Sequence, residues 1–243
     1  MTTPPAPTVD VYGYPDLPDD YTRVVLLMDK PKGWSSFDVI RKLRRLLPVR
    51  KIGHAGTLDP MATGLLICLV GRATKLMETF MGLPKTYEGT LRLGEVTPSY
   101  DAETEVAERN AWQHLTEADL EAARTQFVGE IMQQPPMYSA VKMGGERLYK
   151  KARRGEAVER PPRQVRIDAF DLTGWDGSDV SFHVACSKGT YIRSLAHDVG
   201  QALGVGAHLV ALRRTAIGPY RVEKAWTVEQ LEAALKFGSE FQK

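Results

Sequence analysis

The chain has 243 residues, 43% of them hydrophobic and 26% charged, with a formal net charge of +2, which are ordinary values for a soluble globular protein. Its longest apolar run, residues 65–70, is too short to cross a bilayer, and the proline-rich N-terminus lacks the basic and apolar segments of a signal peptide. Two cysteines, Cys68 and Cys186, exclude a disulfide framework and indicate reduced thiols in a cytoplasmic protein.

The first 47 residues predict a tail, a strand and a helix. Residues 1–21 are expected to be a disordered tail, because prolines interrupt them repeatedly and periodic apolar positions are few. Residues 22–28 predict a buried strand, and a helix is expected to begin at Ser35 or Ser36, with Asp38 completing a variant of the capping box. The apolar stripe expected along this helix comprises Phe37, Ile40, Leu43, Leu46 and Leu47.

The later elements mix strands and helices. A glycine- and proline-punctuated loop is expected over residues 53–64, between two apolar elements. Further strands are expected at residues 65–70, 86–93, 163–172 and 180–185, and further helices at residues 73–81, 116–127, 191–203 and 227–235. Because regular βαβ alternation is missing, the pattern favours an α+β fold over a doubly wound sheet.

Charge is distributed unevenly along the chain. Residues 23–54 hold nine Lys or Arg against two acidic residues, and residues 142–166 hold nine against three. Residues 95–121, in contrast, carry eight acidic residues against Arg109. The basic segments either form faces that bind a polyanion, or form solvated helix faces whose charges are paired with residues elsewhere in the chain.

The segment of residues 53–64, GHAGTLDPMATG, is the most informative part of the sequence. Its glycines permit backbone angles that other residues avoid, and Pro60 restricts the directions in which the Asp59 carboxylate can point. Such a stiff, irregular segment can present an acid, a histidine and a hydroxyl for function. The alternative is that Asp59 is an ordinary turn aspartate and His54 a structural histidine.

This segment resembles the signature loop GHxGTLDPxATG of the TruB family of tRNA pseudouridine synthases. The resemblance continues, in the family's order, in the blocks KTY at residues 85–87, LG and SYDA within residues 93–102, PMYSAVK at 136–142, CSKGTYIRSL at 186–195, and GAHL and LRR within 206–214. It implies a pseudouridine synthase fold, which is a mixed, mainly antiparallel central sheet flanked by helices, with an RNA-gripping insertion. The implied catalytic domain spans residues 22–225, and residues 226–243 would add a helix and a tail.

The resemblance also implies a reaction. Family members convert the T-loop uridine at position 55 of tRNA into pseudouridine by flipping the base, without cofactor or metal, and we expect a monomer. Asp59 would be the catalytic carboxylate, since an aspartate, with an ordinary pKa of about 3.9, is anionic at neutral pH and can trap or stabilise an oxocarbenium-like sugar. Whether it attacks the sugar or the base stays open. Arg193 would orient Asp59 with its fork of donors, and Tyr87 would stack on the target base.

Further positions are implied to bind the substrate. Tyr191 and Leu212 match positions that shape the uracil pocket, although core packing also accounts for such residues, and His54 would lie against the RNA. Phosphate contacts with the tRNA T-arm would give salt-dependent affinity. The residues expected to make them are Lys30, Lys150, Lys151, Arg153 and Arg154. Bacterial relatives usually carry a C-terminal RNA-binding PUA domain, which is expected to be missing from a chain that ends at Lys243.

Other function classes fit less well. A zinc nucleobase deaminase needs an HxE motif and a CxxC motif, whereas His183 and Cys186 form only an isolated HxxC. A complete P-loop and a complete GxGxxG are also missing. A non-catalytic RNA-binding or tRNA-folding module of the same fold remains the alternative, against which the joint presence of Asp59, Tyr87 and Arg193 argues.

Overall fold

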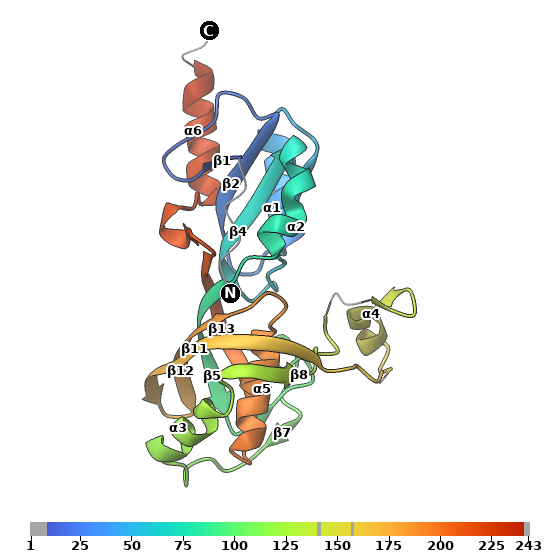
Figure 1. The fold of residues 1–243 in the computed structure, drawn as a ribbon, viewed down its shortest axis with the longest axis vertical. Helices are drawn as coiled ribbons and strands as arrows, with labels where there is room; N and C mark the ends of the chain where they lie inside the picture. Colours follow the sequence, from blue (N-terminus) through green and yellow to red (C-terminus); the bar gives the residue numbers. More distant parts are fainter. Residues whose placement is uncertain (1–8, 140–141, 157, 241–243) are drawn as a thin grey trace. The chain divides into compact units, whose positions relative to one another are not determined.

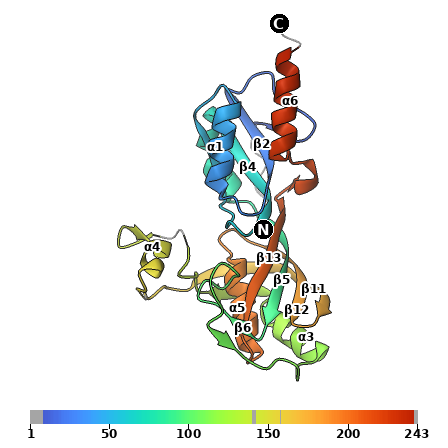
Figure 2. The ribbon, with the colours of Figure 1, turned by 180° about the vertical axis from the view of Figure 1, so that it is seen from behind.

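The computed structural model describes residues 9–139, 142–156 and 158–240. The chain forms two compact units: unit 1 comprises residues 1–87 and 213–243, and unit 2 comprises residues 88–212. The boundary therefore falls inside two strands, β5 (Lys85–Leu93) and β13 (Ala207–Ile217), whose ribbons can be followed in Figures 1 and 2. None of the helices in the described ranges is both long and apolar enough to span a membrane.

Unit 1 is built on a sheet of order β1-β2-β4-β13, with β3 added to β4 and β14 added to β13. Its central pair, β2 (Arg23–Lys30) and β4 (Thr63–Gly71), is antiparallel from Arg23 opposite Gly71 to Lys30 opposite Gly64. The other strands are β1 (Asp10–Tyr12), β3 (Ile52–Ala55) and β14 (Tyr220–Arg221). The strands predicted at residues 22–28 and 65–70 are thus confirmed.

The core of unit 1 lies on both faces of this sheet. Alternate residues of β2 and β4 point to opposite faces, so that Leu66 and Cys68 join one apolar cluster while Leu65 and Ile67 join the other. The first cluster packs against α1 (Ser36–Leu46) and α6 (Val228–Glu240), and the second packs against η1 (Arg72–Leu76) and α2 (Met77–Met81). Burial on both faces explains why β4 is a continuous apolar run in the sequence.

The helix α1 follows the sequence prediction at its N-terminus and departs from it along one side. Ser35 caps the helix in a capping box with Asp38, whose carboxylate accepts the Ser35 backbone N–H at 2.9 Å. Phe37, predicted to be part of the buried stripe, is instead 56% exposed. The buried side is centred on Ile40 and Leu43, and a step of about 100° per residue places Phe37 at its edge.

The prediction of a disordered tail over residues 1–21 is wrong for residues 10–12, which form β1, parallel to β2. Val9 and Val11 pack against the second apolar cluster, and the Tyr14 ring lies 4.9 Å from that of Trp226. This short apolar alternation is stabilised by residues distant in the sequence, so local pattern did not reveal it. Residues 1–8 lie outside the described residues.

Unit 2 contains a sheet of order β13-β5-β12-β11-β8. The long hairpin of β11 (Arg163–Asp176) and β12 (Asp179–Cys186) forms its centre, and β8 (Gly129–Gln133) pairs antiparallel with β11. Burial alternates strictly along β12, as expected of a strand with one buried face. Two of its helices are α3 (Glu117–Thr125), which is capped by Thr116 and Asp119, and α5 (Ile192–Ala202).

Short elements complete the chain. The described residues between β8 and β11 form an insertion that contains β9 (Lys142–Met143), β10 (Glu146–Arg147) and α4 (Leu148–Arg153). The remaining short elements are β6 (Glu95–Val96), β7 (Glu108–Arg109) and η2 (Val222–Lys224). The helix expected at residues 73–81 is divided into the 3₁₀ turn η1 and α2. The mixed, mainly antiparallel sheet flanked by helices confirms the predicted fold class.

Candidate active site

The loop that carries Asp59 connects β3 to β4 in unit 1 and is fastened to the start of α1. The Leu58 backbone N–H donates to the Ser36 hydroxyl at 2.9 Å, and that hydroxyl donates to the Leu58 carbonyl at 3.2 Å. Leu58 itself is buried, and the Ala62 N–H closes a turn on the Asp59 carbonyl at 3.1 Å. Asp59 is partly exposed between these anchors. The backbone is therefore held on both sides of a partly exposed aspartate.

Lys30 supports the same loop from inside the protein. Its side chain is completely buried, and the ammonium donates to the carbonyls of Pro31 at 3.0 Å, Trp34 at 2.6 Å and Pro60 at 3.4 Å. The Gly33 N–H also donates to the Pro60 carbonyl. The prediction that Lys30 contacts RNA phosphate is therefore wrong for this structure, because a buried ammonium held by carbonyl oxygens does not face solvent.

Arg214 on β13 is a second buried cation beneath the loop. It is 1% exposed, and its guanidinium donates to the Leu65 carbonyl at 2.7 Å and the Gly56 carbonyl at 3.0 Å. Burial, with the Arg214 charge adding to it, lowers the pKa of His54 below its ordinary value, so His54 is neutral at pH 7. Arg214 is the last residue of the LRR block in the sequence, but the local sequence pattern did not predict a structural role for it.

Gly64 shows how tightly the loop joins β4. It has a φ of +102°, and a Cβ placed on it would lie 2.3 Å from the Arg214 carbonyl oxygen. We expect Gly64→Ala to lower the free energy of unfolding by more than about 3 kcal/mol, because it combines backbone strain with a clash against main chain. Urea denaturation measures the effect.

Gly33→Ala is the matched control for this substitution. Gly33 also has a positive φ, +84°, but a Cβ there meets nothing within 4 Å. This variant isolates the cost of the backbone angle, about 1–2 kcal/mol. Equal destabilisation of the two variants would contradict a close packing of Gly64 against Arg214.

Tyr87 lies on β5, at the end of the first of the two chain segments that form unit 1. Its side chain is only 8% exposed. The strand is anchored two residues earlier by Lys85, which is buried and donates to the carbonyls of Met81 and Leu83, both at 2.6 Å. Of the predicted site residues, unit 1 thus carries Lys30, His54, Asp59 and Tyr87.

Arg193 lies in the first turn of α5 in unit 2 and is 4% exposed. Its guanidinium donates to the carbonyls of Ser99 at 3.0 Å and Tyr138 at 2.8 Å, and its Nε lies 3.4 Å from a carboxylate oxygen of Asp101. Asp101 is itself 1% exposed and accepts from the Ser99 hydroxyl at 2.5 Å and from the Glu103 N–H at 3.0 Å. This buried carboxylate was present in the SYDA block, but the sequence alone did not reveal its role beside Arg193.

The other predicted residues of unit 2 lie around the same helix and on β13. Tyr191 precedes α5 as its N-cap residue, and its main chain is held by the buried side chain of Gln133, which accepts its N–H at 2.8 Å and donates to its carbonyl at 3.0 Å. The Ser194 hydroxyl donates to the Gln134 carbonyl at 2.8 Å. Leu212 on β13 is 8% exposed. Sequence pattern missed Gln133, because its partner is 58 residues away.

The insertion between β8 and β11 holds the predicted phosphate contacts. Arg154 is exposed and donates through both terminal nitrogens to Glu146 at 2.8 Å and through Nε to Glu156 at 2.7 Å. These hydrogen bonds raise the pKa of Arg154. Lys151 is half-buried, whereas the side chains of Lys150 and Arg153 lie outside the described part of the structure.

Comparison with known proteins places these features in a family. A family described as "TruB family pseudouridylate synthase (N terminal domain)" matches residues 44–192, and one described as "tRNA pseudouridylate synthase B C-terminal domain" matches residues 193–242. A protein of Opitutus terrae named tRNA pseudouridine synthase B is 51% identical over 209 residues, covering 86% of this chain and 87% of that protein. The protein of the same name from Flavobacterium johnsoniae is 46% identical over 227 residues, covering 90% and 99%.

Solved structures agree with this assignment. The crystal structure of a Cbf5-Nop10-Gar1 complex contains a chain that is 30% identical to this one with a TM-score of 0.72. The match covers 92% of this chain but only 57% of that one. The sequence motifs, the fold and these matches lead to one conclusion: the chain belongs to the TruB family of pseudouridine synthases.

Proposed function

We propose that this enzyme isomerises the T-loop uridine at position 55 of tRNA to pseudouridine, with Asp59 as the nucleophile. The observation that carries the proposal is the Asp59 loop, in which a partly exposed aspartate is flanked by backbone held by Ser36, Lys30 and Arg214. Such preorganisation keeps a reactive group in place without cost at the moment of reaction. The named relatives support tRNA as the substrate class.

The reaction is an isomerisation in which no atom is gained or lost. The bond between N1 of uracil and C1′ of ribose breaks, the base turns, C5 bonds to C1′, and the proton on C5 leaves as N1 gains one. The Asp59 carboxylate is suited to trap or stabilise the electron-poor intermediate. In this proposal Arg193 orients that carboxylate, while Asp101 and two carbonyls orient Arg193.

Binding residues complete the proposal. Tyr87 stacks on the flipped base, Tyr191 and Leu212 shape the uracil pocket, and His54, neutral at pH 7, contacts the RNA without carrying charge. In the insertion, Lys150, Lys151 and Arg153 supply positive charge for the tRNA backbone. Arg154 contributes less to binding the tRNA backbone, because its ion pairs with Glu146 and Glu156 already balance its charge.

Incubation with an unmodified tRNA transcript tests the function. We expect one pseudouridine, mapped to position 55, and none in a transcript that carries cytidine at that position. Both transcripts should bind with similar affinity, because phosphate contacts do not depend on the base. Binding without any product would contradict the proposal and favour a non-catalytic RNA-binding module. A product at another uridine would overturn the assigned position.

A further inference from the structure

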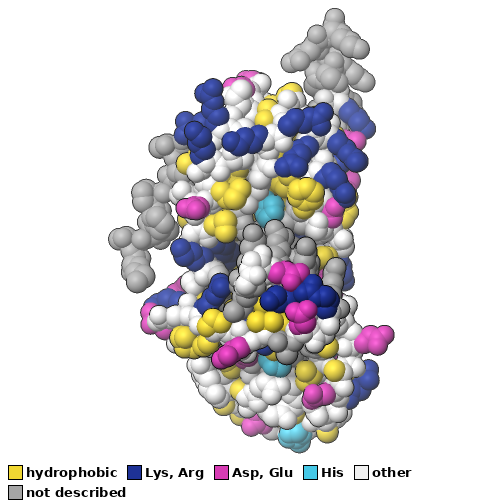
Figure 3. All heavy atoms as spheres, turned by 90° about the vertical axis from the view of Figure 1, so that its right-hand side faces the viewer, with side chains coloured by type: hydrophobic (Ala, Val, Ile, Leu, Met, Phe, Trp, Pro, Cys, Tyr) yellow, Lys and Arg dark blue, Asp and Glu magenta, His cyan; other side chains and the backbone are white. Residues whose placement is uncertain are grey.

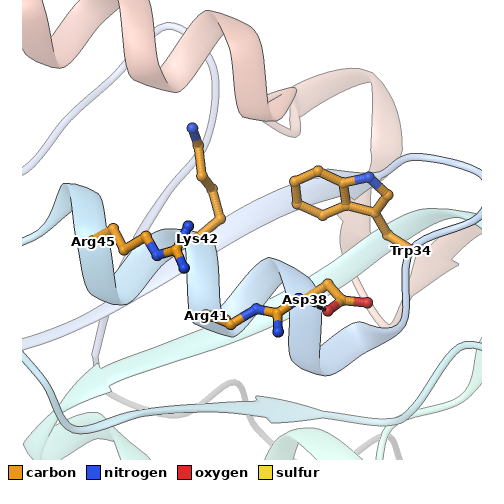
Figure 4. A pocket seen from close by; sticks show the side chains of 5 residues that line it. All are labelled: Trp34, Asp38, Arg41, Lys42 and Arg45. Atoms are coloured by element: carbon orange, nitrogen blue, oxygen red, sulfur yellow. Dashed lines mark hydrogen bonds and ion pairs between the residues drawn. The ribbon is translucent and has the colours of Figure 1, made fainter.

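The outer side of α1 carries a pocket that the site described above does not use. Trp34, Asp38, Arg41, Lys42 and Arg45 line it. Figure 4 shows Trp34 at the N-terminal end of the helix and Lys42 extending toward α6. The helix turns its buried residues, including Ile40 and Leu43, toward the core, while Arg41 and Arg45 are exposed. Trp34 is partly buried and packs against the first apolar cluster. The pocket is therefore a surface feature of unit 1.

Positive charge dominates this surface. Three cations line the pocket against one carboxylate, and residues 41–51 contain six Lys or Arg and no acidic residue. Figure 3 shows Lys and Arg side chains gathered over the face of unit 1 that it presents. Within the described ranges, Arg45 makes no ion pair with a carboxylate. The two arginines of the pocket, Arg41 and Arg45, are both exposed.

The ion pair that Arg41 makes is a weak competitor for an anion. Arg41 pairs with Asp38 one turn earlier, but their side chains are 60% and 31% exposed, and exposed pairs of this kind contribute little. Lys42 pairs at 2.5 Å with Glu232 of α6, which fixes one wall of the pocket. Arg41 and Arg45 are four residues apart and therefore neighbours on one side of the helix, with Cβ atoms about 5–6 Å apart.

Helix stability alone does not explain this arrangement. A cation at the C-terminus of a helix interacts favourably with the macrodipole, which accounts for Arg45 in the last turn. Arg41 lies in the middle of the helix, where this effect is small. Two neighbouring guanidinium groups, a lysine and an indole instead match the chemistry of RNA, because guanidinium forks grip phosphate oxygens and aromatic rings stack on bases.

We infer that the α1 pocket binds the phosphate backbone of RNA at nucleotides outside the target uridine, with Arg41 and Arg45 as the principal phosphate ligands. This inference rests on the proposed function, which makes an RNA the substrate. The first residue of α1, Ser36, holds the Asp59 loop, and the helix is about 16 Å long. Arg41 and Arg45 therefore lie within one helix length of the residue that anchors this loop. RNA bound here adds affinity without reading sequence.

The test compares two double charge reversals in the full chain, using a fluorescein-labelled unmodified tRNA transcript. R41E/R45E should weaken binding at least about tenfold near 0.1 M salt and reduce the slope of log Kd against log salt by about two. R221E/K224E changes the net charge equally, at exposed residues of unit 1 that do not line the pocket, and should bind like the parent. R41Q/R45Q, with a smaller expected loss, guards against misfolding, which circular dichroism would detect.

The outcomes separate this inference from the proposed function. If R41E/R45E binds with the Kd and salt slope of R221E/K224E, the α1 pocket is not an RNA contact, even where the parent forms pseudouridine. If the parent binds tRNA through Arg41 and Arg45 but forms no pseudouridine, the result supports RNA binding at the α1 pocket and contradicts the proposed reaction.

Discussion

Asp59→Asn is expected to reduce pseudouridine formation by more than about 10³-fold, while tRNA affinity stays within about twofold of the parent's. The substitution removes the charge and nucleophilicity of the carboxylate with almost no change in shape. The loop should remain in place, because Leu58, Pro60 and Gly56 anchor it through their main-chain groups. Single-turnover conversion of a tRNA transcript and equilibrium binding measure the two quantities.

The matched control for this variant is Asp176→Asn, which removes one carboxylate from an exposed position on β11 in unit 2. It alters the net charge equally and should leave both the rate of pseudouridine formation and the tRNA affinity unchanged. Turnover by Asp59→Asn near the parent's rate would eliminate Asp59 as the nucleophile. Loss of tRNA binding by the same variant would show that the carboxylate supports the loop rather than the reaction.

Asp101→Asn is expected to lower the free energy of unfolding by about 3 kcal/mol. Asp101 and Arg193 are almost completely buried, and removing the charge of one member of a buried pair makes the other costly to keep there. We place the effect at the lower end of the usual range, because the carbonyls of Ser99 and Tyr138 still accept from the guanidinium. Activity should fall too, since Arg193 is then less firmly oriented.

Ser99→Ala is the comparison for the Asp101→Asn variant. It removes the hydroxyl that donates to Asp101 at 2.5 Å but leaves the carboxylate charged. Loss of one such hydrogen bond should cost about 1–2 kcal/mol. Urea denaturation of both variants measures the difference. If Asp101→Asn were no more destabilising than Ser99→Ala, the charge of Asp101 would contribute nothing to holding Arg193.

Local chemistry made much of the fold predictable. The capping boxes at Ser35 and Thr116 join residues three apart, so they depend only on neighbouring side chains and appear where the sequence places them. The apolar run of β4 and the alternation of β12 likewise follow from burial on two faces or on one. Arg193 and Tyr191 stand at the start of the predicted helix, although their roles in the site remain predictions based on family resemblance.

Tertiary contacts decided what the local pattern left open. Lys30 stands in a basic segment and was expected at the RNA, yet folding buries it beneath Pro60, 30 residues away. Arg214 reaches Leu65 across 149 residues, and Gln133 reaches Tyr191 across 58. The sequence by itself determined the central strands β2 and β4, the capped starts of α1 and α3, and the loop that carries the carboxylate. Only the folded chain determined which charged side chains are buried and hold the main chain by hydrogen bonds, because burial depends on contacts between residues far apart in sequence.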